Sequence, residues 1–158
     1  MYKKEFEIRW SDVDANGHLA NSAYVNFMSH TRVEFLKENG LPIKKLLDNG
    51  IGPVVFSEQV YYFKESFLGD TIDVSLAVSG LSENGKFFKF EHNFYNKQGK
   101  HLATCDITGS WIDLKQRKLT ALPTELQHKL MDLPKTDDFR QLTKDEMRSA
   151  GKAPKDLS

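Results

Sequence analysis

The sequence predicts an α+β fold in which one antiparallel sheet wraps around a single long helix. Three observations carry this prediction. Residues 22–39 show the apolar spacing of a long helix, and four segments with the composition of strands follow it in succession. Only short turns separate those four segments, as in an antiparallel sheet. A long helix with an apolar face needs a sheet to cover it, so the sheet is expected to curl around this helix.

The first strand is predicted at residues 4–10, where apolar and charged side chains alternate. Its inward side chains are expected to be Phe6, Ile8 and Trp10. The long helix begins after a polar turn, and its buried face collects Tyr24, Phe27, Met28, Thr31 and Phe35. Asn21 is the predicted N-cap, Gly40 is the predicted C′ residue, and Pro42 prevents the helix from continuing.

The remaining elements follow in order. A short helix at residues 43–49 ends at Gly50, and the four strand segments occupy residues 53–65, 71–79, 86–96 and 101–114. The side chains expected to point inward from the second of these segments are Ile72, Val74, Leu76 and Val78. Those expected to share one face of the third are Phe88, Phe90, His92 and Phe94. Asn84-Gly85 and Gly99 mark hairpin turns, and residues 122–133 form a last short helix.

The chain of 158 residues suits one domain, and no internal repeat or linker suggests a second. We expect a single domain over residues 1–133. Residues 134–158 are mostly charged, which predicts a loosely held C-terminal tail with a helical stretch near residues 144–149. The edges of such a sheet must be covered, and pairing between copies would cover them. We therefore expect a homodimer or a dimer of dimers.

Composition narrows the class of function. The 22 Lys and Arg residues balance 22 Asp and Glu residues, and this zero net charge argues against a nucleic-acid partner. No signal-peptide pattern and no apolar run of about 20 residues is visible, so no membrane partner is expected. The single cysteine, Cys105, cannot form an internal disulfide and reads as a small buried residue. These features predict a cytoplasmic protein.

The stretch RWSDVDANGHLANSAY, residues 9–24, contains several side chains that could take part in a reaction. Asp12 and Asp14 are followed by Asn16, His18 and Asn21, just ahead of the long helix. Two interpretations stay open from these residues alone. They form an Asx turn and a helix cap that serve folding. Alternatively, they form a reaction centre at a helix N-terminus, where backbone N–H groups and the helix dipole favour negative charge.

The longer stretch RWSDVDANGHLANSAYVNFMSHTRVEFL resembles the start of hotdog-fold acyl-CoA thioesterases of the 4-hydroxybenzoyl-CoA thioesterase-like branch. The matching residues are Arg9, Asp12, Asp14, Gly17, His18, Asn21, Tyr24 and Arg32. The stretch VVFSEQVYYFKESFLGDTIDV resembles the second and third strands of that family, so the resemblance covers roughly residues 4–130. The turn is also similar to the D-x-N-x-H-x-N-N motif of plant-type acyl-carrier-protein thioesterases, although Ala20 replaces the first Asn of the final pair.

The resemblance implies the hotdog fold and the hydrolysis of an acyl-CoA thioester to a free acid and CoA, without a metal or cofactor. It implies that Asp14 is the nucleophile or the base that activates water, and a positioned base contributes ~10²–10⁴-fold. The implied oxyanion donor is the backbone N–H of Asn21, aided by its side chain, and one such donor contributes roughly 2.7–4 kcal/mol. His18 polarises the carbonyl, orients Asp14 or protonates the leaving sulfur, or it only holds the turn. Asp12 is expected to set the turn or to bind water at the surface.

Four further residues have a structural alternative beside a functional one. Asn16 orients a carboxylate or water, or it is half of a plain Asn-Gly turn. Gly17 permits a positive φ or the close approach of a ligand. Tyr24 binds substrate, or it belongs to the core, which we favour. Glu58, on the strand segment after the helices, reaches the pocket from a neighbouring subunit, or it is a solvated strand residue.

Three functions are compared at this point. An acyl-CoA thioesterase is the first, and an acyl-carrier-protein thioesterase is the second, favoured by the D-x-N-x-H pattern. The third is a module that binds an acyl thioester without cleaving it, which Asp14 disfavours. In the resembling family the pocket runs between subunits, which implies that Asp14 of one copy acts beside residues 56–60 of the other.

Overall fold

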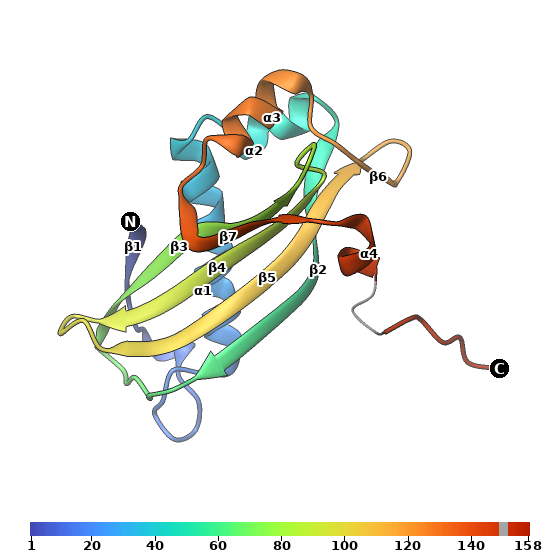
Figure 1. Cartoon of the computed structure of the whole chain (residues 1–158). Coiled ribbons are helices and arrows are strands. Elements are labelled where there is room, and N and C mark those ends of the chain that lie inside the picture. The colour runs from blue at the N-terminus through green and yellow to red at the C-terminus, as the bar shows by residue number, and fades with distance from the viewer. Residues whose placement is uncertain (149–151) are drawn as a thin grey trace.

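The computed structural model describes residues 1–148 and 152–158. In the described residues one seven-stranded sheet covers helix α1 (Asn21–Glu38), which lies behind the sheet in Figure 1. The strands are β1 (Tyr2–Glu7), β2 (Ile51–Tyr62), β3 (Thr71–Ser82), β4 (Phe87–Asn96), β5 (His101–Asp113), β6 (Lys118–Thr120) and β7 (Lys135–Leu142). The shorter helices are the 3₁₀ helix η1 (Trp10–Asp12), α2 (Ile43–Asp48), α3 (Thr124–Met131) and α4 (Lys144–Arg148).

The strand order is β1-β3-β4-β5-β2, with β6 paired to β5 and β7 paired to β3. Every pair on the main path is antiparallel. An antiparallel sheet around one long helix is the hotdog fold that the sequence predicts, and this prediction is confirmed.

The core lies between α1 and the sheet, where the sequence periodicity predicts it. All the residues expected to point inward from β3 and β4 are buried, and so is the predicted buried face of α1. Burial of one large apolar side chain contributes roughly 1.5–3 kcal/mol. Several such side chains therefore hold α1 against the sheet and fix the position of its N-terminus.

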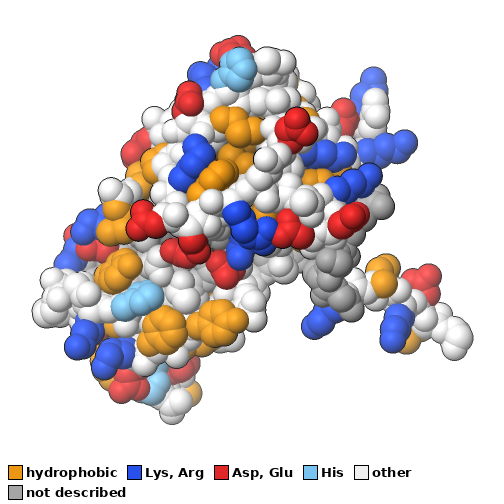
Figure 2. All heavy atoms as spheres, viewed as in Figure 1, with side chains coloured by type: hydrophobic (Ala, Val, Ile, Leu, Met, Phe, Trp, Pro, Cys, Tyr) orange, Lys and Arg blue, Asp and Glu red, His pale blue; other side chains and the backbone are white. Residues whose placement is uncertain are grey.

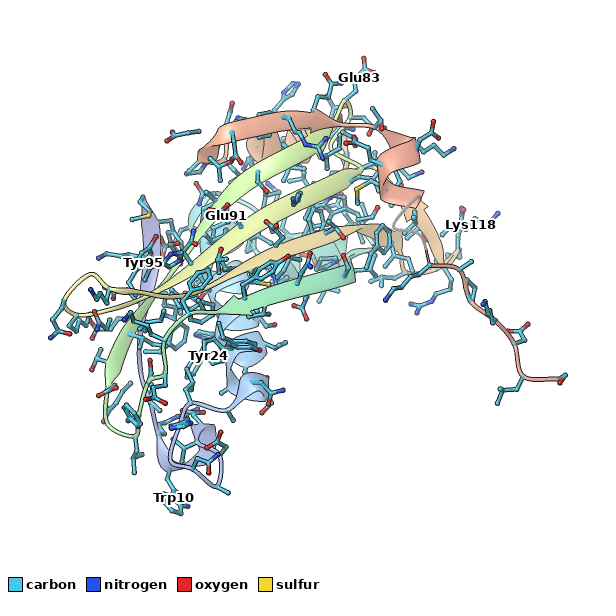
Figure 3. The ribbon with its side chains drawn as sticks, turned by 60° about the horizontal axis from the view of Figure 1, so that its bottom comes forward. Trp10, Tyr24, Glu83, Glu91, Tyr95 and Lys118 are labelled. Atoms are coloured by element: carbon cyan, nitrogen blue, oxygen red, sulfur yellow. The ribbon has the colours of Figure 1, made fainter. Side chains whose placement is uncertain are left out.

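The chain leaves the first strand earlier than predicted, so Trp10 does not point inward. It is 79% exposed, and Figure 3 shows it at one end of the molecule, directed away from the sheet. The cause is a local capping box in η1. The Arg9 backbone N–H donates to Asp12 Oδ2 over 2.9 Å, and the Arg9 side chain donates to the same carboxylate. This arrangement turns the chain after Ile8 and confirms that Asp12 sets the turn.

The C-terminal segment differs from the loose tail expected after residue 133. β7 pairs in parallel with β3 from Val78 to Ser82, beyond the stretch that pairs with β1. Figure 1 shows β7 lying along the body of the molecule before α4, and residues 152–158 extending away from it. Backbone hydrogen bonds to a strand edge need no apolar run, and of the side chains of β7 only Leu142 is fully buried. The predicted helical stretch is confirmed as α4, while Ser149 lies outside the described residues.

Candidate active site

A pocket of about 450 Å³ opens at the N-terminal end of α1. From the polar turn and α1 its wall receives Asp14, His18, Asn21 and Tyr24. From the end of β2 and the following loop it receives Tyr62, Phe63, Lys64 and Glu65. Most of the residues singled out in the turn therefore line one pocket. A second segment, about 45 positions further along the chain, lines the same pocket.

The Asp14 carboxylate has one oxygen that holds the turn. Its Oδ1 accepts hydrogen bonds from the backbone N–H of Asn16 over 2.8 Å and of His18 over 3.1 Å. Its Oδ2 accepts no hydrogen bond from any residue that the structure describes, and the residue is exposed at the pocket. The Asx-turn interpretation is thus correct for one oxygen, and the other oxygen is accessible to a water molecule.

Asn16 and Gly17 shape the turn without lining the pocket. Asn16 contributes its backbone N–H to Asp14, as described above, and its side chain is exposed. Gly17 has φ +77°, which confirms the predicted positive φ. No atom lies within 4 Å of the place that a Cβ on Gly17 would take, so the backbone conformation alone requires glycine here.

The N-terminus of α1 lacks the side-chain cap that the sequence predicts. Asn21 is the first helical residue, and the N-cap is Ala20, whose methyl group cannot accept a hydrogen bond. Within residues 1–148, the backbone N–H groups of Asn21 and Ser22 find no acceptor. The Asn21 N–H and the positive end of the helix dipole therefore lie at the wall of the pocket, as a developing oxyanion requires, and the Ser22 N–H is the next donor along the helix.

The ring and the backbone of His18 have separate partners. Its backbone N–H holds Asp14, whereas its ring Nε2 lies 3.0 Å from Glu65 Oε2. The ring also packs edge-on against Phe67, with 5.3 Å between ring centroids. The ring makes no hydrogen bond to Asp14 in the described residues, and the roles predicted for the His18 ring stay predictions. Sequence reasoning missed Glu65, which no motif or spacing connects to His18.

Tyr24 is both a core residue and a wall of the pocket. Its ring lies 5.0 Å from the ring of Tyr62 and 5.0 Å from the ring of Phe94. Burial, and then the neighbouring Tyr62, raises the pKa of Tyr24 to about 12. Figure 3 shows Tyr24 reaching out from α1 on the side of the sheet where β2 lies. The preferred core assignment is confirmed, and the hydroxyl keeps its proton at neutral pH.

Glu58 does not line the pocket of its own protomer. It lies in a cluster beneath the middle of α1, with Oε1 3.8 Å from Arg32 Nη2. Arg32 Nη1 approaches His92 Nε2 to 3.4 Å, and His92 Nδ1 lies 3.0 Å from the Ser75 carbonyl oxygen. Burial and the Arg32 charge lower the pKa of His92 to about 3, so this histidine is neutral. The cluster runs from the exposed Glu58 through the half-buried Arg32 to the buried His92, and none of the three lines the pocket that holds Asp14.

Cys105 does not line the pocket. Burial raises the pKa of the Cys105 thiol to about 12, and its predicted place as a buried small residue is confirmed.

Among the described residues, no group of three or more His, Cys, Asp or Glu side chains is arranged to hold a metal ion. No helix in the same residues is both long enough and apolar enough to span a membrane.

Comparisons with known proteins concern the whole chain. The family model described as thioesterase-like superfamily matches residues 8–130. The long-chain acyl-CoA thioesterase FadM of Escherichia coli is 27% identical over 132 residues, which are 83% of this chain and 98% of FadM. The chloroplastic acyl-acyl carrier protein thioesterase ATL3 of Arabidopsis thaliana is 22% identical over 139 residues, which are 87% of this chain and 72% of ATL3. Among solved structures, SAV2348 of Staphylococcus aureus in complex with CoA has a TM-score of 0.77 at 18% identity, and the match covers 97% of this chain and 94% of SAV2348.

Proposed function

This chain belongs to the thioesterase-like superfamily, and on that premise we propose that it hydrolyses acyl-CoA thioesters to free acids and CoA. The observation that carries the proposal is the state of Asp14 at the pocket. One of its carboxylate oxygens is fixed by two backbone N–H groups, and the other is accessible beside the uncapped N-terminus of α1. FadM, one of the relatives, is named as a long-chain acyl-CoA thioesterase, which supports the same substrate class.

The proposed reaction begins with a water molecule next to Asp14 Oδ2. Asp14 takes a proton from this water as its oxygen attacks the thioester carbonyl carbon. The negative charge that develops on the carbonyl oxygen is stabilised by the backbone N–H of Asn21 and by the helix dipole. The carbon–sulfur bond then breaks, and the CoA sulfur takes a proton from the His18 ring. The proton on Asp14 passes through solvent and restores His18, so that one water is consumed for each acid and thiol released.

Lys64 is the place in this pocket where a phosphate of the carrier is proposed to bind. Its side chain lines the same pocket as Asp14, and its backbone N–H is fixed to the Leu102 carbonyl over 3.0 Å. CoA and the acyl carrier protein both present a phosphopantetheine arm, so Lys64 does not distinguish the two carriers.

The similarity to ATL3 and the D-x-N-x-H pattern support the acyl carrier protein as a second candidate. We also propose a cytoplasmic location, which a lone buried thiol fits.

The test is the release of free thiol from a panel of acyl-CoA substrates of increasing chain length. We expect turnover above background for part of the panel and none with Asp14→Asn. Cleavage of acyl carrier protein substrates alone would favour the second candidate. Tight binding of acyl-CoA by the wild-type protein without any thiol release would identify a binding module instead.

The oligomer is proposed to be a homodimer that pairs through β2. This strand ends the sheet, and among residues 1–148 and 152–158 only β5 pairs with it. The opposite side of the sheet is better covered, because β1 and β7 lie one after the other along β3. Figure 2 shows hydrophobic side chains gathered low on this face, over the start of β5 and the end of β2. Tyr61 and Phe63, at the end of β2 and directly after it, are exposed. An unpaired long edge with exposed aromatic residues favours a second copy as its partner. Sedimentation should show a dimer, and a stable monomer at micromolar concentration would contradict it.

The proposed dimer gives Glu58 a second role, at the pocket of the partner. We propose that Asp14 of one copy acts beside residues 56–60 of the other. Mixing Asp14→Asn protein with Glu58→Trp protein tests this arrangement, because each parent homodimer should be inactive. Mixed dimers should regain about one working site each, whereas a mixture that stays inactive while both parents fold and exchange would place the pocket within one protomer.

A further inference from the structure

Glu65 and His18 meet across the pocket although neither belongs to a motif that includes the other. The His18 ring Nε2 lies 3.0 Å from Glu65 Oε2, and both side chains line the pocket that holds Asp14. We infer that Glu65 is a positioning residue that holds the His18 ring for the protonation of the leaving thiolate. This inference rests on the proposed function, and it adds Glu65 to the residues on which the reaction depends.

The Glu65 side chain is 59% exposed and that of His18 is 35% exposed, so the contact lies at the surface, but the backbone on both sides of Glu65 is fixed. On one side, the Phe63 and Lys64 N–H groups donate to the Leu102 carbonyl over 2.8 and 3.0 Å. On the other side, the Ser66 carbonyl accepts from the Leu19 N–H over 2.8 Å, and Ser66 is buried. An exposed ion pair usually contributes little because two mobile side chains must be ordered. Here the loop is already ordered by bonds to β5 and to the catalytic turn itself.

The His18 ring is held from a second direction. Phe67, two residues after Glu65, packs against it, and the backbones at His18 and Phe67 form an isolated antiparallel bridge. The loop after β2 therefore brings a carboxylate and an aromatic ring to the same imidazole. A functional histidine generally needs such a third group to fix its orientation and its tautomer.

The contact determines which ring nitrogen can act. Glu65 accepts the proton of Nε2–H, and Nδ1 has no hydrogen-bond partner in the described part of the chain. The nearby carboxylate offsets the positive charge of the ring while it carries both protons. When the carbon–sulfur bond breaks, Nδ1 gives its proton to the sulfur. The ring then becomes neutral, with Nε2–H still donated to Glu65.

The central experiment is a double-mutant cycle of Glu65→Gln and His18→Asn. Glutamine has nearly the same shape as glutamate but no charge. With an acyl-CoA that the wild type cleaves, we expect Glu65→Gln to lower kcat by roughly 10-fold or more and to leave KM nearly unchanged, because a positioned acid contributes ~10²–10⁴-fold and loses part of this when its ring is no longer oriented. In the His18→Asn background the same substitution should cause no further loss.

The matched control is Glu83→Gln, the same chemical change in the hairpin between β3 and β4. Glu83 is exposed, and Figure 3 shows it at the end of the molecule opposite to Trp10. Its kcat and KM should equal those of the wild type. Three results would overturn the inference: an unchanged kcat in Glu65→Gln, a rise in KM without a fall in kcat, or losses that add fully in the double variant.

A measurement without substrate separates this inference from the proposed function. Nitrogen-15 NMR of the His18 ring should show Nε2 protonated in the wild-type protein and a changed pattern in Glu65→Gln, but not in Glu83→Gln. If the wild type cleaves no acyl thioester, the proposed function fails while this measurement still reports the pairing. If the enzyme is active and the ring signals do not respond to Glu65→Gln, only the positioning role fails.

Discussion

The two ends of helix α1 are built in opposite ways. At the C-terminal end, the Gly40 N–H donates to the Lys37 carbonyl over 3.2 Å and the Leu41 N–H donates to the Leu36 carbonyl over 2.8 Å. These are the two bonds of a Schellman motif, and Leu41 is fully buried. At the N-terminal end, Ala20 provides no side-chain cap. A missing cap typically costs about 1 kcal/mol. The difference indicates that one end serves stability and the other keeps donors available to the pocket.

The turn before α1 is nevertheless firmly held, because a different acid holds it. The buried Asp12 carboxylate accepts bonds from the backbone and side chain of Arg9, and its backbone carbonyl accepts from the Ala20 N–H over 2.8 Å. Asp12 and Asp14, two positions apart, thus have different roles. Asp12 is used for structure, and Asp14 keeps one oxygen accessible.

The largest expected effect is the loss of kcat when Asp14 is replaced. Asp14→Asn should keep the fold and the dimer but lower kcat by at least ~10²-fold, since an amide cannot take a proton from water. Asp12→Asn should instead lower the free energy of unfolding by about 1–3 kcal/mol, because it weakens a buried charge-assisted contact. Steady-state kinetics and urea unfolding of both variants measure these effects.

The reverse ranking would contradict the comparison. If Asp12→Asn lost turnover and Asp14→Asn retained kcat within a few-fold of the wild type, the wrong acid would have been assigned to the reaction. Activity must be normalised to folded protein, because Asp12→Asn is expected to reduce the folded fraction.

A smaller effect is expected at the C-terminal end of α1. Gly40 has φ +80°, a conformation that costs a residue with a Cβ about 1–3 kcal/mol. Its new methyl group would also approach the Lys129 side chain, 3.0 Å away, which is flexible enough to move. Gly40→Ala should therefore lower the free energy of unfolding while kcat per folded molecule stays at the wild-type value. A loss of kcat in folded Gly40→Ala protein would show that the two ends of the helix are coupled.

Sequence patterns predict α1, the faces of β3 and β4, and much of the pocket, each for a physical reason. Burial imposes a period on side chains, so Val74 and Phe90 are placed correctly. Asp14, His18 and Asn21 meet because one short turn carries them. Glu65 could not be found this way, since tertiary contacts bring its loop to the turn, among them the Leu19–Ser66 hydrogen bond and the bridge between His18 and Phe67. β7 was missed because its pairing uses backbone groups, which leave no pattern in the sequence.

The smallest effect concerns the one-residue difference between the predicted and observed cap. Ala20→Asn places an amide where α1 lacks a side-chain acceptor. An N-cap side chain bonds the second or third backbone N–H of a helix, which here belong to Ser22 and Ala23. We expect the free energy of unfolding to rise by about 1 kcal/mol, and Tm to rise by roughly 2–4 °C in a chain of this size. Urea unfolding and thermal scans measure both changes.

The activity of the same variant identifies the oxyanion donor. The new cap leaves the backbone N–H of Asn21 unoccupied, so kcat should stay within about two-fold of the wild type if this group stabilises the oxyanion. A gain in stability together with a ~10-fold or larger fall in kcat would assign the donor to Ser22 instead, because the cap would then compete with the substrate. If Ala20→Asn does not raise the free energy of unfolding, the missing cap does not destabilise the fold. The two ends of α1 would then not differ in their contribution to stability.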